Sequence, residues 1–194
     1  MDSNNARKGL PAFAVLGIIA VVAALVLALT NTVTKGPIAE HQMSALRASF
    51  AAVMPAESYA ELEVPENFGV GSLYEAKNGT ETVGWCVTAS VTGYGGPVAV
   101  TLGVGTDGVV TGCVVGDTNF AETAGFGARA KEPAFQDQFI GLDGQNGGSI
   151  EAISGATITS TAVLDAANLA LRCVNELGLK KPAATESIVT FSNK

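Results

Sequence analysis

The sequence predicts an α+β protein, in which a single N-terminal transmembrane helix is followed by a small domain with an antiparallel sheet flanked by helices. Three observations support this class. Residues 10–29 are uncharged and apolar, β-rich segments and turn signals fill residues 82–115, and residues 160–177 have the spacing of an amphipathic helix. At 194 residues the chain has room for one ordinary domain and a short appendage.

The appendage is the N-terminal segment. As a helix, the run LPAFAVLGIIAVVAALVLAL would be roughly 30 Å long, which matches the hydrocarbon thickness of a bilayer. We expect a cytoplasmic stub over residues 1–9 and a transmembrane helix over residues 10–30. The alternative is a cleaved signal peptide, but its apolar core is usually about 7–15 residues long and precedes a small-residue cleavage site. The exit from this run, LALTNTVTKG, offers no good Ala-x-Ala.

Charges predict the orientation of the span and exclude one class of partner. Arg7 and Lys8 precede the apolar run and Lys35 follows it, which favours a cytoplasmic N-terminus and an extracytoplasmic domain on the cell (inner) membrane. The rest of the chain has nine Lys and Arg residues against seventeen Asp and Glu residues. Such an acidic surface repels phosphate backbones, so no nucleic-acid partner is expected.

Three cysteines, Cys86, Cys113 and Cys173, are widely spaced and form no C-x-x-C pair. This spacing disfavours an iron–sulfur cluster or a zinc ribbon held by this chain alone. Cys86 and Cys113 could pair across neighbouring strands, or all three could be small buried apolar residues, which is the interpretation we favour. The lone histidine, His41, has no nearby ligand partner and indicates a surface position, so no metal site is expected.

After the span, Gly36-Pro37 interrupts the apolar pattern, and a helical spacing resumes over residues 38–53. We expect a helix that leaves the membrane and packs on the domain. Residues 31–80 therefore comprise this membrane-proximal helix and a connecting region, of which the acidic residues 56–81 show no clear element.

Three β-rich runs follow, over residues 82–91, 97–104 and 109–115. Asp107-Gly108 lies between the last two runs, where glycine supplies the positive φ that a tight turn requires. The sequence therefore predicts a small antiparallel meander.

Short elements lead to the C-terminal part of the chain. We expect a helix over residues 132–139, a turn-rich loop over residues 141–148 and a strand over residues 149–153. The polar tail of residues 181–194 is expected to be flexible.

The clearest element is a helix that Thr159 or Ser160 can cap and that ends near Leu177, with Gly178 in the expected C-terminal position. Its apolar face is formed by Val163, Ala166, Ala167, Ala170, Val174 and Leu177.

Directly before this helix stands SGATITS, residues 154–160, a glycine turn with four hydroxyl side chains that enters a helix N-terminus. Free backbone N–H groups and the positive end of the helix dipole favour an anion there, most naturally a phosphate. The alternative is a purely local helix cap, because Ser and Thr are common caps. The segment is neither a P-loop nor a G-x-G-x-x-G, so nucleotide hydrolysis and Rossmann binding are not indicated.

EAISGAT, residues 151–157, resembles the flavinylation motif of FMN-binding domains, in which an acidic residue precedes Ser/Thr-Gly-Ala-Thr. YGGP at residues 94–97 and ETAGFG at residues 122–127 resemble the GYGGP and ETPGLG loops of that family. Three motifs in this order behind one anchor are similar to those of RnfG, the flavin-carrying component of Rnf-type electron-transport complexes. NqrC, from the sodium-translocating NADH:quinone reductase, is a related carrier.

This resemblance implies that FMN is joined covalently, through its phosphate, to the hydroxyl of Thr157 by a separate flavin transferase. It implies an FMN-binding domain over residues 81–180. It also implies an electron carrier that works with the other membrane subunits of an Rnf-type complex, which moves electrons between ferredoxin and NAD and transports sodium or protons. Such a chain is a redox subunit and not a complete enzyme.

The resemblance assigns cofactor-binding residues but no catalytic residue. They are Thr157, Ser154, Gly155, Ala156, Ile158, Thr159, Ser160, Thr123, Glu122, Gly125, Phe126 and Tyr94. Amides at the helix start would stabilise the phosphodiester, and Tyr94, Thr123, Gly125 and Phe126 would line the isoalloxazine ring. Glu122 would either line the flavin or fix its loop through backbone hydrogen bonds. Trp85, the sole tryptophan, is expected in the core rather than beside the flavin.

The chain departs from the family pattern at four positions. Glu151 stands where aspartate is common, Ala124 and Phe126 replace proline and leucine, and Phe120 replaces a histidine. None of these changes the acceptor threonine. Two other functions are considered: a stand-alone anchored flavoprotein that donates electrons to an extracytoplasmic reductase, and a non-redox assembly domain.

Overall fold

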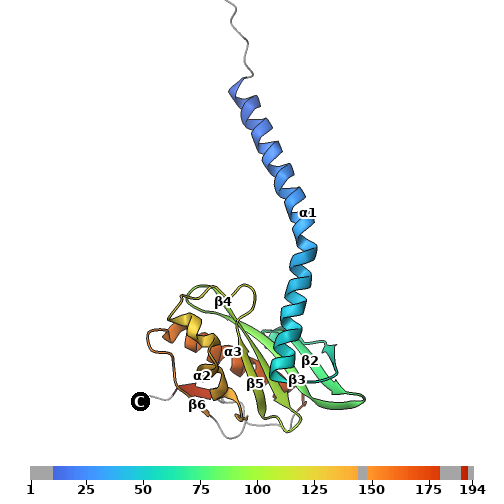
Figure 1. Ribbon diagram of the computed structural model, residues 1–194, viewed down its shortest axis with the longest axis vertical. Helices are drawn as coiled ribbons and strands as arrows, with labels where there is room; N and C mark the ends of the chain where they lie inside the picture. The colour runs from blue at the N-terminus through green and yellow to red at the C-terminus, as the bar shows by residue number, and fades with distance from the viewer. Residues whose placement is uncertain (1–10, 144–147, 180–188, 192–194) are drawn as a thin grey trace, which may run out of the picture. The chain divides into compact units, whose positions relative to one another are not determined.

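A computed structural model describes residues 11–143, 148–179 and 189–191 of the chain (Figure 1). Its contacts define two compact units, Met1–Met43 and Ser44–Lys194. The expected cytoplasmic stub, residues 1–9, lies outside the described residues.

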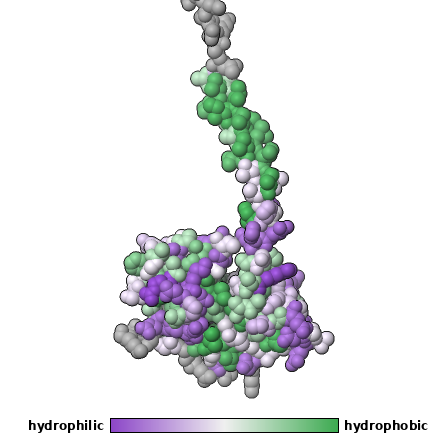
Figure 2. All heavy atoms as spheres, viewed as in Figure 1, coloured by the Kyte–Doolittle hydropathy of each residue, from purple (hydrophilic) through white to green (hydrophobic). Residues whose placement is uncertain are grey.

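The N-terminal unit contains the first part of α1 (Ala12–Val53). Within the described residues, α1 is the single helix long and apolar enough to cross a bilayer, with a mean hydropathy of 3.0 over 18 residues. This part of the helix is exposed and forms a green surface in Figure 2. Thr30, Thr32 and Thr34 each donate a hydroxyl hydrogen bond to the carbonyl four residues earlier, which satisfies these polar groups within the helix.

The expected interruption at Gly36-Pro37 is wrong, because α1 continues through both residues to Val53. A proline inside a helix removes one backbone hydrogen bond and costs about 3 kcal/mol. That cost is local, and it does not end the helix at this point. The predicted helix is therefore present, but as the continuation of α1.

A five-stranded antiparallel sheet in the order β1-β2-β3-β4-β5 forms the centre of the domain. The strands are β1 (Ser58–Leu62), β2 (Val70–Asn78), β3 (Glu81–Thr92), β4 (Pro97–Gly105) and β5 (Val110–Val115). The last three strands confirm the predicted meander. Its turn has the expected form, since Gly108 has a φ of 77° and Asp107 Oδ1 accepts a 3.0 Å hydrogen bond from the Val109 N–H.

The strands β1 and β2 arise from the acidic region that showed no clear element in the sequence. Few of their side chains are buried, with Leu73 and Ala76 as the buried residues of β2. The alternation of apolar and polar residues is therefore weak. β1 lies at the edge of the sheet, where charged residues such as Glu61 discourage pairing with another chain. A 3-10 turn, η1 (Glu66–Phe68), connects the two strands.

The helix α3 (Thr157–Glu176) packs on one face of the sheet, against β3 and β4 above all. Its predicted apolar face is confirmed. The buried members are Val163, Ala166, Ala167, Ala170 and Val174, and Leu177 packs partly buried against the same core. Trp85 belongs to this core as expected, with 8% of its surface exposed. Gly178 follows the helix with a φ of 68°, the left-handed conformation typical of a helix C-terminus.

The last turns of α1 pack on the opposite face of the sheet, as expected for the membrane-proximal helix. Phe50, Val53 and Met54 are buried there against Ala76 and Cys86. The end of the helix is also fixed by hydrogen bonds, because the carbonyls of its last residue and of the residue after it accept from side chains of the sheet. Thr111 Oγ1 donates to the Val53 carbonyl at 2.7 Å, and the Tyr59 hydroxyl donates to the Met54 carbonyl at 2.9 Å.

Short elements complete the domain. They are η2 (Gly127–Lys131), α2 (Pro133–Gln136), η3 (Asp137–Phe139), β6 (Gly148–Ile150) and β7 (Val189–Phe191). The predicted helix over residues 132–139 is confirmed as α2 and η3, whereas the strand predicted over residues 149–153 ends at Ile150. β6 pairs in parallel with β7, so three residues of the tail form a strand. Residues 144–147 of the loop, and residues 180–188 and 192–194 around β7, lie outside the described part.

Candidate functional site

The hydroxyl-rich segment forms a tight turn and the first residues of α3. Gly155 has a φ of 78°, a left-handed conformation that side chains rarely adopt, and the Ala156 N–H donates to the Ile153 carbonyl at 2.9 Å. α3 begins at Thr157, with Ala156 as its N-cap. The prediction that Thr159 or Ser160 caps this helix is therefore wrong, because both residues lie inside its first turn.

The four hydroxyl groups of this segment have different environments. Ser160 is buried, where its hydroxyl accepts a hydrogen bond from the Ile153 N–H at 3.0 Å and donates to the Ala156 carbonyl at 3.0 Å. Thr159 is also buried and donates to Glu122 Oε2 at 2.9 Å. Ser154 and Thr157 are exposed. Thr157 thus presents an accessible hydroxyl at the first position of the helix.

The start of α3 is electrostatically suited to an anion. The first backbone N–H groups of an α-helix have no acceptor within the helix, and no side-chain hydrogen bond caps this end of α3. Together with the helix dipole, the amides of Thr157, Ile158 and Thr159 favour a negative group beside them. The lining of the adjoining pocket contains no Lys or Arg side chain, so backbone dipoles would supply this stabilisation.

Three segments meet at a pocket of about 480 Å³ beside Thr157. Its lining consists of Tyr94, Glu122, Thr123, Phe126, Gly127, Gly155, Ala156, Thr157, Ile158 and Thr159. The structure therefore brings together three motifs that are far apart in the sequence. Tyr94, Phe126 and Ile158 are strongly exposed for apolar side chains, at 73%, 54% and 57%. The volume lies within the range of about 300–1,000 Å³ that is typical of ligand sites.

Glu122 makes contacts with protein groups on two other segments. Its Oε1 atom accepts hydrogen bonds from the Tyr94 N–H at 2.9 Å and the Gly95 N–H at 3.1 Å, while Oε2 accepts from Thr159. Of the two roles considered for Glu122, this geometry supports the fixing of loops.

Not every predicted residue lines the pocket. Ser154 and Gly125 are exposed but lie outside the lining, and Ser160 lies buried below the turn. Gly127 was absent from the predicted set, although it is the last residue of the ETAGFG motif. A Cβ atom at Gly127 would overlap the Glu122 carboxylate, so a side chain here would displace that carboxylate from its observed position.

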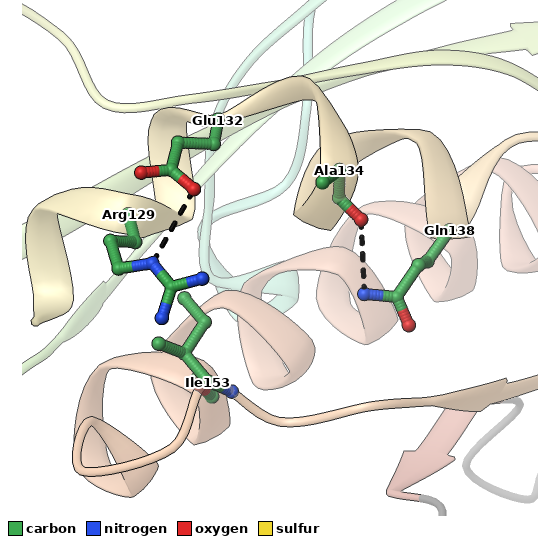
Figure 3. A network of polar contacts seen from close by, with 6 residues as sticks. Arg129, Glu132, Ala134, Gln138 and Ile153 are labelled. Atoms are coloured by element: carbon green, nitrogen blue, oxygen red, sulfur yellow. Dashed lines mark hydrogen bonds and ion pairs between the residues drawn. The ribbon is translucent and has the colours of Figure 1, made fainter.

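A glutamine that the sequence did not single out holds the segment before the turn. Gln138 accepts a 2.7 Å hydrogen bond from the Glu151 N–H and donates to the carbonyls of Glu151 and Ala134 at 3.4 Å each. Figure 3 shows the contact of Gln138 with Ala134, together with the ion pair of Arg129 and Glu132 nearby. No local pattern marks Gln138, since its partner Glu151 lies in another segment.

The cysteines do not form a site. Cys86, Cys113 and Cys173 are free and buried, which agrees with the interpretation as small apolar residues. Burial raises the pKa of the Cys86 and Cys113 thiols to about 12 and that of Cys173 to about 11. Among the residues described, no group of three or more His, Cys, Asp and Glu side chains could hold a metal ion.

We expect the native protein to resist thiol modification. At pH 8 only about one Cys86 thiol in 10,000 would be ionised at the raised pKa, compared with about one in four of a free cysteine, and the thiolate is the reactive form. A chromogenic disulfide reagent should therefore label no thiol within minutes in the native state and all three in denaturant. A single labelled thiol after unfolding without reductant would contradict the free state of Cys86 and Cys113.

The chain is similar to known proteins over most of its length. The family profile of the FMN-binding domain matches residues 93–172, and that of the RnfG N-terminal region matches residues 14–53. The G subunit of the Na(+)-translocating ferredoxin:NAD(+) oxidoreductase complex of Acetobacterium woodii is 32% identical, over 84% of this chain and 90% of the relative. The G subunit of the ion-translocating oxidoreductase complex of Methanosarcina acetivorans is 33% identical, over 81% and 90%.

A solved structure, the NqrC of Shewanella oneidensis, aligns with a TM-score of 0.46 at 15% identity, over 65% of this chain and 70% of that one. The sequence relatives are similar over most of their length and of this chain, and the two family profiles fall on α1 and on the pocket-bearing domain. The chain therefore belongs to the RnfG family, the G subunits of ion-translocating oxidoreductase complexes, and contains an FMN-binding domain.

Proposed function

We propose that this chain is the FMN-carrying electron-transfer subunit of a membrane-bound, Rnf-type complex, in which electrons pass between ferredoxin and NAD and sodium or protons are transported. Family membership supports this function. The redox chemistry belongs to the flavin when it is bound, and the protein supplies its position and electrostatic environment. The partners would be the other membrane subunits of the complex.

The flavin would be attached through its phosphate to Thr157 Oγ by a flavin transferase. The observation that carries this proposal is the exposed Thr157 hydroxyl at the first position of α3, in the wall of the pocket. The neighbouring hydroxyls of Thr159 and Ser160 are buried and hydrogen-bonded, so they are poor acceptors for a transferase. The residues fit the group, since the helix start stabilises a phosphodiester and the pocket has room for a ring system.

The roles of the remaining residues follow from their places. The amides of Thr157, Ile158 and Thr159 would stabilise the phosphodiester charge. Tyr94, Thr123 and Phe126 would contact the isoalloxazine ring. Ser154, Gly155, Ala156 and Ser160 would shape the turn, and Gly125 would give its loop the required conformation, with a φ of 78°.

The membrane arrangement is also a proposal. The apolar segment of residues 10–30, which includes the start of α1, would span the membrane, with the basic residues Arg7 and Lys8 on the cytoplasmic side. Residues 31–80 would connect it to an extracytoplasmic FMN-binding domain of residues 81–180. Covalent attachment would keep the cofactor from being lost outside the cytoplasm.

Flavin fluorescence on a denaturing gel tests the tether, with each variant made alongside a flavin transferase. We expect a fluorescent wild-type band and none for Thr157→Ala, whereas Thr118→Ala, which removes an exposed hydroxyl outside the three motifs and the pocket lining, should remain fluorescent. Thr157→Ser keeps a hydroxyl and should retain flavin. A wild-type band without flavin would refute the covalent tether, and a fluorescent Thr157→Ala band would show that another residue is the acceptor.

A further inference from the structure

The carboxylate of Glu122 joins the three segments that wall the pocket. Its two oxygen atoms accept hydrogen bonds from the backbone of the YGGP loop and from the Thr159 hydroxyl on α3, and Glu122 itself begins the ETAGFG loop. Thr159 lies 37 residues away in the sequence. We call this set of hydrogen bonds the Glu122 clamp.

Three glycines, Gly93, Gly95 and Gly127, leave room for the clamp, and a Cβ atom at Gly93 would lie 2.5 Å from Glu122 Oε1. A Cβ atom at Gly127 would overlap the Glu122 carboxylate and lie 2.7 Å from Thr159 Oγ1, and one at Gly95 would overlap the Ala121 carbonyl. A side chain at Gly127 or Gly93 would displace the Glu122 carboxylate, and one at Gly95 would meet backbone, so a substitution at any of these positions would disturb the clamp. The loops therefore pack directly against the carboxylate and its neighbour in the chain.

Each clamped segment contributes one exposed apolar side chain to the pocket wall. Tyr94 comes from the YGGP loop, Phe126 from the ETAGFG loop and Ile158 from the first turn of α3. We call these three side chains the apolar rim. Apolar surface of this kind at a pocket is suited to a flat aromatic ring, since rings bury apolar area and stack on aromatic neighbours.

We propose that Glu122 is a positioning residue, which sets the apolar rim around the isoalloxazine ring of FMN through the clamp and does not itself bind the flavin. This rests on the proposed attachment at Thr157. A tether through the phosphate restrains only one end of the cofactor, so the rim must fix the ring. Both oxygens of Glu122 are already hydrogen-bonded to protein groups, so its contribution is geometric.

Flavin-loaded full-length protein provides the test, by visible-region circular dichroism and fluorescence anisotropy of the flavin. An achiral ring gives strong visible dichroism only when its surroundings are fixed, so Glu122→Ala should lose most of that signal and show lower anisotropy. Glu122→Gln should keep both signals, because its amide oxygen can accept from the two N–H groups and its NH₂ group can donate to Thr159. Glu63→Ala, at an exposed carboxylate outside the pocket lining, is the matched control and should resemble wild type.

Amide hydrogen exchange reports directly on the hydrogen bonds of the Glu122 clamp. In Glu122→Ala, exchange at Tyr94 and Gly95 should accelerate on the order of tenfold or more, since hydrogen bonds to a charged acceptor are lost. Thr159→Val, which removes one hydrogen bond at similar volume, should leave these two amides protected and lower the flavin dichroism only in part. This variant keeps the proposal testable if Glu122→Ala does not fold.

Three outcomes would overturn the proposal. Flavin dichroism unchanged in a Glu122→Ala protein with fast-exchanging amides would show that the clamp does not position the ring. If Glu122→Gln lost as much flavin dichroism as Glu122→Ala, the negative charge of Glu122 would matter and the geometry of its hydrogen bonds would not. Wild-type protein without flavin on the denaturing gel would refute the attachment at Thr157. It would then also refute the proposal that the Glu122 clamp positions the attached ring.

Discussion

Replacing Phe50 by alanine is expected to lower the free energy of unfolding of the domain by about 3–5 kcal/mol, the range for buried phenylalanines. Phe50 is 1% exposed, and its ring lies 4.8 Å from the Tyr74 ring and 5.4 Å from the Tyr59 ring, centroid to centroid. The deletion would leave a cavity between the end of α1 and the sheet. Chemical denaturation of the full-length protein in detergent, followed by the fluorescence of Trp85 in the core, measures the change.

Phe13→Ala is the matched control for Phe50→Ala. Phe13 lies in the apolar part of α1 and is 79% exposed, so its removal should leave the unfolding of the domain unchanged. A loss below about 1 kcal/mol for Phe50→Ala would mean that the end of α1 does not hold the sheet as described, since surface substitutions have effects of that size or less.

Gly112→Ala is expected to destabilise the domain by about 1–3 kcal/mol or more, the usual cost of overpacking. A Cβ atom at Gly112 would lie 2.7 Å from Val53 Cα, and neither backbone can move without disturbing the sheet or α1. Gly112 pairs with Gly103 across β4 and β5, and a Cβ at Gly103 would lie 2.8 Å from the Val53 carbonyl carbon. Two glycines thus form the flat area on which the helix end packs.

Gly71→Ala provides the control for this substitution. Gly71 also lies in a strand, and the nearest atom to its Cβ position is the Thr88 carbonyl oxygen at 3.4 Å, an ordinary contact. The free energy of unfolding of this variant should remain within about 0.5 kcal/mol of wild type. Similar losses for Gly71→Ala and Gly112→Ala would point to a general cost of alanine in these strands and contradict the close approach of Val53.

Some features of the fold could be predicted because they depend on local periodicity. The apolar run of α1, the Asp107-Gly108 turn of the meander and the buried face of α3 are patterns of neighbouring residues. The strands β1 and β2 were not predicted, because they bury few side chains and their apolar periodicity is weak. Pro37 suggested a helix end that the structure does not have.

In the candidate site, too, some features could be predicted from the sequence and others could not. The three motifs, at residues 94–97, 122–127 and 151–157, were recognisable as short sequence patterns. The last of them also indicated Thr157 as the proposed attachment residue for FMN. The environment of each hydroxyl was not, since the sequence does not show that Thr159 and Ser160 are buried and hydrogen-bonded while Thr157 is exposed.

Local residue patterns were enough to predict the apolar N-terminal helix, the meander, the amphipathic α3 and the family motifs, because each depends on residues close together in the chain. Folding of the whole chain determines that α1 runs unbroken to Val53, that Thr157 is exposed, and that Glu122 binds two other segments. The contacts that fix these elements join residues far apart in the sequence, such as Thr111 and Val53, which are 58 positions apart and hydrogen-bonded. Such contacts form only when the chain packs, because burial selects which polar groups must find partners and which remain accessible to solvent.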